Sequence, residues 1–144
     1  MQVRPMTRKD CEQVAAIEAV SFSVPWSLSA FTETLQKENF RYYVAEENGE
    51  ILGYCGFLFV LDEAEIPNVC VKESVRRRGV GRQMMETLIK EAANLGMCRL
   101  LLEVRESNAG ARALYESLGF CEDGIRKNFY EKPTEDAVLM SMTL

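Results

Sequence analysis

A run of arginines and glycines is the segment of this chain best suited to hold an anionic ligand. Residues 76–81 read Arg-Arg-Arg-Gly-Val-Gly and lie between a predicted strand ending at Val71 and a predicted helix beginning near Gly81. Glycines there let the backbone approach a ligand closely, and the start of a helix presents free N–H groups with a positive partial charge. The segment predicts a pyrophosphate cradle, with a solvated basic turn as the alternative.

Two familiar phosphate-binding motifs do not fit this segment. A Walker loop would continue into Gly-Lys-Ser/Thr, and a dinucleotide-binding loop would carry a third glycine where Met84 stands. The expected ligand is therefore another molecule that carries a diphosphate.

The chain contains no histidine, which restricts its acid–base chemistry. Ser-His-Asp and Cys-His catalysis and the HExxH zinc motif are excluded, so a base must be a carboxylate, phenol, thiol or amine. Glu103 is a candidate because it is an acidic residue set into the apolar strand LLLEV, with an ion pair to a neighbouring arginine as the ordinary alternative. The spacing around Tyr115 by itself favours core packing.

Composition narrows the class of protein further. The 144 residues include 17 basic and 22 acidic side chains, a net charge of −5, and a nucleic-acid binder would have to rely on the single cluster Arg76–Arg78. No apolar run approaches the ~20 residues of a membrane span. The five cysteines form no CxxC pair and lie mostly in apolar runs, so we expect reduced, buried thiols in a cytoplasmic protein, without disulfides or a metal site.

Periodicity and turn signals predict a single α/β domain over residues 1–144, with the element order βααβββαβαββ. The Asn48-Gly49 pair predicts a type I′ hairpin turn. The predicted strands are about Gln2–Pro5, Arg41–Glu46, Glu50–Leu61, Glu65–Val71, Arg99–Val104, Phe120–Arg126 and Ala137–Thr143. The predicted helices run from about Thr7 to Val20, Ser27 to Glu38, Gly81 to Leu95 and Ala109 to Leu118.

Five further motifs, in order along the chain, support a resemblance to a known family. They are FSVPWS (22–27), LDEAEIPNVCV (61–71), LEVRESN (102–108), LYESLGF (114–120) and IRKNFY (125–130). With Arg76, Gly79 and Gly81 matching the signature Gln/Arg-x-x-Gly-x-Gly/Ala, the chain resembles the Gcn5-related N-acetyltransferase (GNAT) family from about Phe22 to Met142. The resemblance implies a mixed, mostly antiparallel sheet flanked by helices, acetyl-CoA as cosubstrate and no metal.

The resemblance also implies how acetyl-CoA is held. In the family, the strand before the glycine loop splays at a bulge, and its free main-chain groups pair with the pantetheine arm. Residues 68–71 take that place here, and Pro67, which cannot donate to a ladder, is consistent with the break. The implied cofactor-binding residues are Val69, Cys70, Val71, Arg77, Arg78, Gly79, Val80, Gly81, Arg82 and Asn108.

The implied reaction is direct attack of a free amine on the acetyl thioester. Glu103 would take the proton, itself or through a water, since an α-amino group with a pKa of ~7.7–8 arrives largely protonated. Tyr115 would donate a proton or a hydrogen bond to the departing CoA thiolate. An acetyl-Cys70 intermediate is the competing route, and it is disfavoured because the chain has no histidine to activate that thiol.

Within the family, the motifs together resemble enzymes that acetylate the N-terminal alanine of a small-subunit ribosomal protein. Trp26 and Tyr130, on predicted loops, are the expected substrate-binding residues. The acidic residues Asp62, Glu63 and Glu65 could attract a basic chain end. The expected partner is thus a basic N-terminal peptide of a ribosomal protein, bound by a monomer.

Two alternatives stay open. One keeps the chemistry and changes the acceptor to other protein N-termini, lysine side chains or a small-molecule amine. The other is a non-catalytic acetyl-CoA-binding regulator, which a Glu103→Gln variant would distinguish from an enzyme.

Overall fold

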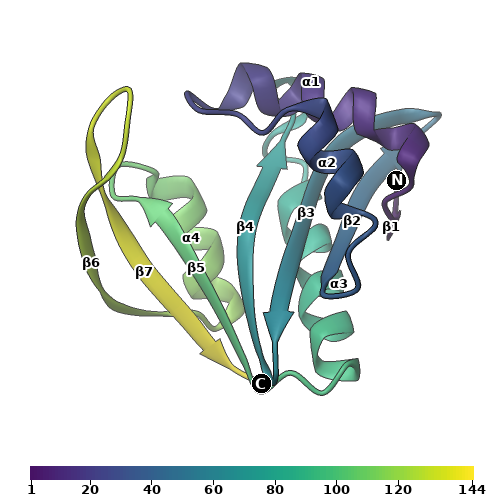
Figure 1. Cartoon of the computed structure of the whole chain (residues 1–144). Coiled ribbons are helices and arrows are strands. Elements are labelled where there is room, and N and C mark those ends of the chain that lie inside the picture. The colour runs from purple at the N-terminus through teal and green to yellow at the C-terminus, as the bar shows by residue number, and fades with distance from the viewer.

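A computed structural model describes all of residues 1–144 and shows a seven-stranded sheet with helices on both faces (Figure 1). The strands stand in the order β1-β2-β3-β4-β5-β7-β6, and only β4 and β5 pair in parallel. The strands are β1 (Gln2–Pro5), β2 (Phe40–Glu47), β3 (Glu50–Val60), β4 (Glu63–Val71), β5 (Arg99–Arg105), β6 (Cys121–Tyr130) and β7 (Glu135–Thr143). The helices are α1 (Cys11–Ser21), α2 (Leu28–Thr34), α3 (Val80–Asn94) and α4 (Ala109–Leu118). The predicted α/β class, element order and mostly antiparallel sheet are confirmed.

Neighbouring residues of β2 alternate between two apolar clusters. Tyr42 and Val44 pack with residues of α1 and α2, whereas Tyr43 and Ala45 pack with residues of α3 and α4. Because successive side chains of a strand point to opposite faces, the two pairs of helices cover opposite faces of the sheet. The central strands are therefore buried on both sides and give the site a fixed platform. No helix has the length and apolar composition needed to cross a bilayer.

The predicted hairpin turn after β2 and the predicted end of α2 had different outcomes. Asn48 and Gly49, between β2 and β3, have φ of 53° and 83°, so the predicted left-handed hairpin turn is confirmed. The helix predicted to reach Glu38 instead ends at Thr34. Beyond it, the backbone N–H of Gln36 donates to a carbonyl only three residues back, at 3.1 Å. This tighter turning leads the chain out of the helix and toward β2.

β4 and β5 run side by side over only part of their length. Their ladder ends at Ile66 and Leu102, and beyond that point the two strands diverge (Figure 1). On its other edge β4 advances three residues, from Glu65 to Asn68, while β3 advances two. This bulge includes Pro67, whose ring nitrogen has no proton to donate to a ladder. The break in pairing predicted at Pro67 is confirmed.

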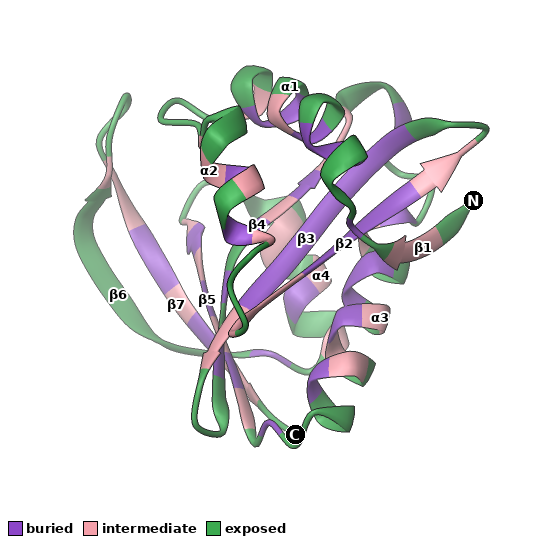
Figure 2. Ribbon diagram, turned by 45° about the vertical axis from the view of Figure 1, so that its right-hand side comes forward, coloured by how far each residue is buried: buried purple, intermediate pink, exposed green.

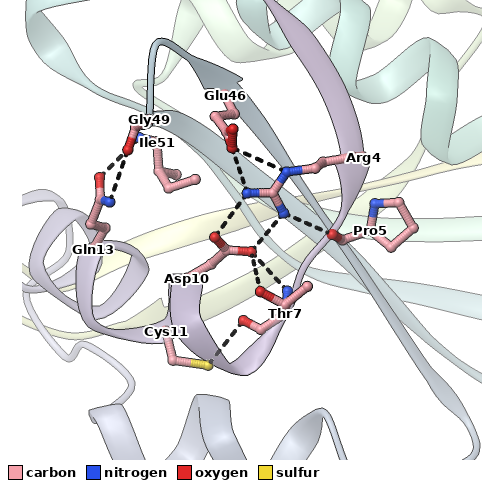
Figure 3. Close-up of polar contacts among 9 residues, drawn as sticks. All are labelled: Arg4, Pro5, Thr7, Asp10, Cys11, Gln13, Glu46, Gly49 and Ile51. Carbon is pink, nitrogen blue, oxygen red and sulfur yellow. Dashed lines mark hydrogen bonds and ion pairs between the residues drawn. The ribbon is translucent and has the colours of Figure 1, made fainter.

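An arginine near the N-terminus ties β1 to β2 and to the start of α1 (Figure 3). Arg4 donates to both carboxylate oxygens of Asp10, at 2.8 and 2.9 Å, and to Glu46 at 2.7 Å. Asp10 also accepts a hydrogen bond from the backbone N–H of Thr7 at 2.8 Å. The Arg4 contacts therefore fix where α1 begins relative to the edge of the sheet.

This ion pair predicts a stability change that depends on pH. The hydrogen bonds from Arg4 hold the pKa of Asp10 below its ordinary value of 3.8. The ionised carboxylate thus stabilises the fold above that value, and the stabilisation is lost as the pH falls through the lower folded-state pKa. In urea unfolding, Asp10→Asn should cost about 2 kcal/mol near pH 7 and less near pH 3. The corresponding change at the exposed Glu12, Glu12→Gln, should alter the free energy of unfolding little. A cost for Asp10→Asn that did not vary with pH would contradict this account.

The five cysteines are all free. The expectation of buried thiols is confirmed for Cys11, Cys55 and Cys70 and is wrong for Cys98 and Cys121, which are exposed. Cys121 lies on β6, the edge strand, whose residues are almost all exposed (Figure 2). The apolar neighbours of Cys121 in the sequence could not reveal that its strand would stand at the edge.

Candidate active site

A cleft of about 810 Å³ opens where β4 and β5 diverge. Its walls come from β4, from β5 with the loop after it, from α4, from the segment between α1 and α2, and from the turn between β6 and β7. The predicted site residues that line it are Trp26, Val69, Glu103, Asn108, Tyr115 and Tyr130. Residues from separate motifs of the sequence therefore meet in one place.

Beyond Ile66, main-chain groups of β4 point toward the edge of the strand that no longer pairs with β5. The backbone N–H of Lys72 donates to a β3 carbonyl at 2.8 Å, so by alternation Cys70 also directs its main-chain groups toward β3. Val69 and Val71 then direct theirs toward the open edge. The Val71 carbonyl accepts a hydrogen bond there from Nε of Arg76, at 3.3 Å. An extended ligand lying along this edge would meet the main chain of Val69.

The predicted pyrophosphate loop lies past the end of β4 and is not part of the cleft wall. Arg77 and Gly79 have φ of 68° and 80°, and Gly79 immediately precedes α3. At Gly81, in the first turn of α3, a Cβ would stand 3.4 Å from Leu114 and 3.6 Å from Val71. A Cβ at Gly81 would thus make only ordinary contacts, whereas Gly79 provides the left-handed turn from which α3 starts.

Besides Arg76, two more arginines around this loop are bound to the protein itself. Arg78 forms an ion pair with Glu47 at 3.2 Å, and Arg82 donates to the hydroxyl of Ser117 at 2.6 Å. Arg77 is exposed. An anion at the loop would therefore meet the backbone N–H groups of the helix start, with Arg77 as the nearest uncommitted guanidinium.

Glu103 faces the cleft from β5 and also forms an ion pair. Its Oε1 lies 3.1 Å from Nη1 of Arg126 on β6, and its side chain remains 32% exposed. Within the sheet it pairs only with Leu139 of β7, because β4 has already diverged. The two explanations open from the sequence are thus compatible: Glu103 is an ion-paired strand residue that a ligand in the cleft can reach.

α4 supplies two of the predicted residues. Tyr115 is 7% exposed and packs edge-on against Phe120, with ring centroids 5.8 Å apart. Burial raises the pKa of the Tyr115 phenol. Asn108 caps the helix, since its Oδ1 accepts from the backbone N–H of Ala111 at 3.2 Å. Both residues also line the cleft, so each combines a structural contact with access to a ligand.

Trp26 and Tyr130 come from two different walls of the cleft. Trp26 precedes α2 and packs against Phe31, with ring centroids 5.3 Å apart. Burial, together with the nearby charge of Glu103, raises the pKa of Tyr130 to about 12. Tyr130 was predicted on a loop but ends β6, whose regular pairing with β7 is lost between Arg126 and Tyr130. The expected loop is therefore an irregular strand end.

A buried polar network beneath the cleft was not predicted. Glu18 of α1 is 2% exposed and accepts hydrogen bonds from the Tyr54 hydroxyl at 2.5 Å and the Trp26 backbone N–H at 2.9 Å. It also accepts from the amide of Asn68 at 3.3 Å, and Asn68 accepts from the Tyr42 hydroxyl at 2.6 Å. The sequence signal was an acidic residue four positions after Val14, on the apolar face of the helix.

The acidic cluster expected to attract a substrate lies away from the cleft. Glu63 and Glu65 are at the start of β4, where it still pairs with β5, and Asp62 immediately precedes the strand. None of the three lines the cleft. Glu63 is 3.7 Å from Arg99. The cleft has its own acidic residues, which are Glu18, Glu103, Glu131 and Glu135, against the basic Arg105 and Lys132. Attraction of a basic chain end by Asp62, Glu63 and Glu65 stays a prediction, and the structure adds acidic residues within the cleft itself.

The chain belongs to the acetyltransferase (GNAT) family, whose family model matches residues 11–120. The family resemblance carried by the motifs, and the acetyltransferase class that it implies, are confirmed.

Individual relatives within this family are named as one kind of acetyltransferase. The ribosomal protein bS18-alanine N-acetyltransferase of Escherichia coli (strain K12) is 41% identical over 132 residues, which cover 89% of this chain and 87% of that protein. The protein of the same name from Haemophilus influenzae is 38% identical over 138 residues, which cover 94% of this chain and 93% of that protein. The crystal structure of the Escherichia coli ribosomal-protein-S18-alanine N-acetyltransferase matches with a TM-score of 0.91 at 37% identity, covering 99% of this chain and 92% of that one.

Proposed function

We propose that this chain transfers the acetyl group of acetyl-CoA to the α-amine of an N-terminal alanine on a small-subunit ribosomal protein. The observation that carries the proposal is that Glu103 and Tyr115 line one cleft at the point where β4 and β5 diverge. The relatives' names supply the acceptor. We also propose that the protein acts in the cytoplasm, because the relatives are named for a ribosomal substrate. It is proposed to act as a monomer, since one chain supplies both Glu103 and Tyr115 and a second copy is not needed to complete the pair.

The residues along the open edge of β4 fit acetyl-CoA, which supplies a reactive acetyl thioester. Main-chain groups of Val69 and Val71 can pair with an extended amide-bearing arm. Past the end of the strand, backbone N–H groups of residues 79–82 at the start of α3 can bind a pyrophosphate. Arg77 is placed to add a positive charge, and Asn108 lines the far side of the cleft.

Glu103 is proposed to take the proton that the substrate amine must lose before it can attack. A carboxylate on the cleft wall can accept that proton directly or through a water. Arg126, on the other side of Glu103, holds the side chain in place at 3.1 Å.

Tyr115 is proposed to donate a hydrogen bond to the departing thiolate, not to transfer its proton completely. A phenol with an ordinary pKa near 10 is already a weaker acid than a thiol with a pKa of ~8.5. Burial raises the pKa of Tyr115 further, which makes full transfer less favourable still.

The acceptor peptide is proposed to enter between Trp26 and Tyr130. These aromatic side chains come from the segment before α2 and from the end of β6, so they can contact a chain end from two sides. Four acidic residues and two basic ones line the cleft, and this balance favours a positively charged amino terminus and a basic peptide behind it.

The proposal is tested with the purified chain, acetyl-CoA and two synthetic peptides that share one basic sequence. One peptide begins with a free alanine, and the other has a blocked N-terminus and keeps its lysines. We expect mass spectrometry to find one added acetyl group on the first peptide and none on the second. Acetylation of the blocked peptide would favour a lysine acceptor. Binding of acetyl-CoA without any transfer would favour a non-catalytic regulator.

A Cys70→Ala variant should turn over within about threefold of the unchanged enzyme. Cys70 is 7% exposed, its side chain packs with the apolar cluster of α1 and α2, and burial raises the pKa of its thiol. The reactive thiolate is therefore scarce where a covalent route would need it. Steady-state rates give the comparison, and enzyme mixed with acetyl-CoA alone should gain no acetyl mass. A folded variant without activity, together with acetylated Cys70 in the parent, would contradict direct transfer.

A further inference from the structure

Arg105 occupies a junction between two walls of the cleft. It follows Glu103 by two positions on β5, so the two side chains leave the same face of the strand. One wall is the segment between α1 and α2, and the other is the turn between β6 and β7. These walls carry Trp26 and Tyr130, the residues proposed above to contact the acceptor.

The guanidinium of Arg105 contacts both walls at once. Its Nη2 donates to the backbone carbonyl of Glu131 at 2.9 Å and to the hydroxyl of Ser23 at 3.3 Å. Its Nη1 donates to the carbonyl of Pro133 at 3.0 Å and lies 3.2 Å from a carboxylate oxygen of Glu135. One side chain therefore donates to four acceptors on two separate segments.

Two further contacts complete this arrangement, which we call the Arg105 clamp and which consists of Arg105, Ser23, Tyr130, Glu131, Pro133 and Glu135. The Ser23 hydroxyl donates directly to the Glu131 carbonyl at 2.9 Å, joining residues 108 positions apart. The Arg105 guanidinium also lies over the Tyr130 ring, 4.6 Å from its centroid. The clamp thus sets the position of an acceptor-side aromatic as well as the separation of the walls.

We propose that Arg105 is a positioning residue that fixes the acceptor entrance in the shape that receives a peptide chain end. This inference rests on the proposed function and adds the residue that shapes the substrate side of the same site. Only arginine offers a planar fork of donors that can reach several carbonyls while its face stacks on an aromatic ring. A lysine at this position would keep the charge but lose the fork.

β5 itself offers a matched control. Arg99, at the opposite end of the strand, is 3.7 Å from Glu63 and from Asp123, and it does not line the cleft. Arg99→Ala and Arg105→Ala therefore remove the same side chain from one strand at positions outside and inside the site.

The experiment compares the parent, Arg105→Ala, Arg105→Lys and Arg99→Ala in steady-state assays that vary the alanine peptide and acetyl-CoA separately. For Arg105→Ala we expect the KM for the peptide to rise about tenfold or more, with the KM for acetyl-CoA within about twofold. Arg105→Lys should fall between the parent and Arg105→Ala, and Arg99→Ala should match the parent. A fall in kcat with both KM values unchanged would indicate a merely structural role and overturn the inference.

Amide hydrogen exchange on the same variants measures the clamp without an acceptor peptide, so its result does not depend on the proposed substrate. Exchange in residues 22–26 and 130–135 should quicken in Arg105→Ala and stay at the parent level in Arg99→Ala. If the parent did not acetylate the alanine peptide, the proposed function would fail, and exchange would still decide whether Arg105 holds the two walls. Unchanged exchange in both segments would overturn the clamp.

Discussion

Replacing Glu103 with glutamine should lower kcat by about 10²–10⁴-fold, the range that general-base catalysis contributes. Glutamine has nearly the same shape and can still accept a hydrogen bond from Arg126, but its amide cannot take a proton from the substrate amine. Because Glu103 lies on β5 and not on the open edge of β4, acetyl-CoA should bind the variant with nearly unchanged affinity. Calorimetric titration of acetyl-CoA and single-turnover rates measure the two quantities separately.

The residual rate of Glu103→Gln provides a second readout. Without a base, only the fraction of amine that is already neutral can react, so the rate should rise steeply as the pH approaches the α-amino pKa of ~8. Glu106→Gln is the matched control, because Glu106 is exposed, lies three residues further along and does not line the cleft. It should retain activity within about twofold. A Glu103→Gln enzyme as active as this control would exclude Glu103 as the base.

Replacing Glu18 with alanine should lower the free energy of unfolding by about 3–5 kcal/mol, the largest stability loss we expect from a single change in this chain. The carboxylate accepts from the Tyr54 hydroxyl, the Trp26 backbone and the Asn68 amide, and it is 2% exposed. Without Glu18, these donors would stay in the interior with no acceptor, and each unsatisfied group costs about 1–3 kcal/mol. The midpoint of thermal unfolding should fall by about 10 °C.

Glu12→Ala on the same helix is the control for this change. Glu12 is exposed, so its removal should alter the free energy of unfolding by no more than about 0.5 kcal/mol. Urea unfolding of the two variants gives the comparison. A loss below about 1 kcal/mol for Glu18→Ala would mean that the three donors find other partners, and the network would not be a principal support of the cleft floor.

Features that depend on neighbouring residues could be predicted from the sequence. The Asn48-Gly49 turn and the bulge at Pro67 follow from backbone preferences that act within a few positions. The span of α4 was also predicted correctly, because Asn108 and Gly119 are capping residues at its two ends. The lack of histidine left carboxylates and phenols among the possible proton-handling groups, the family motifs singled out Glu103 and Tyr115, and the fold places both in one cleft.

Features that join distant residues could not be predicted in this way. The sequence distance between Glu18 and Tyr54 is 36 residues, and between Ser23 and Glu131 it is 108. Periodicity tells which face of an element is apolar, but it does not tell which element lies opposite that face. The exposure of Cys121 was missed for the same reason, since only the strand order places β6 at the edge.

The central claim, N-terminal acetylation of a small-subunit ribosomal protein, is tested most directly by intact-mass spectrometry of ribosomal proteins from cells with and without this chain. We expect one small-subunit protein that begins with alanine to lose the mass of one acetyl group when the chain is missing. Expression of the unchanged chain should restore that mass, and expression of Glu103→Gln should not. Identical masses for every ribosomal protein in the two strains would contradict the account.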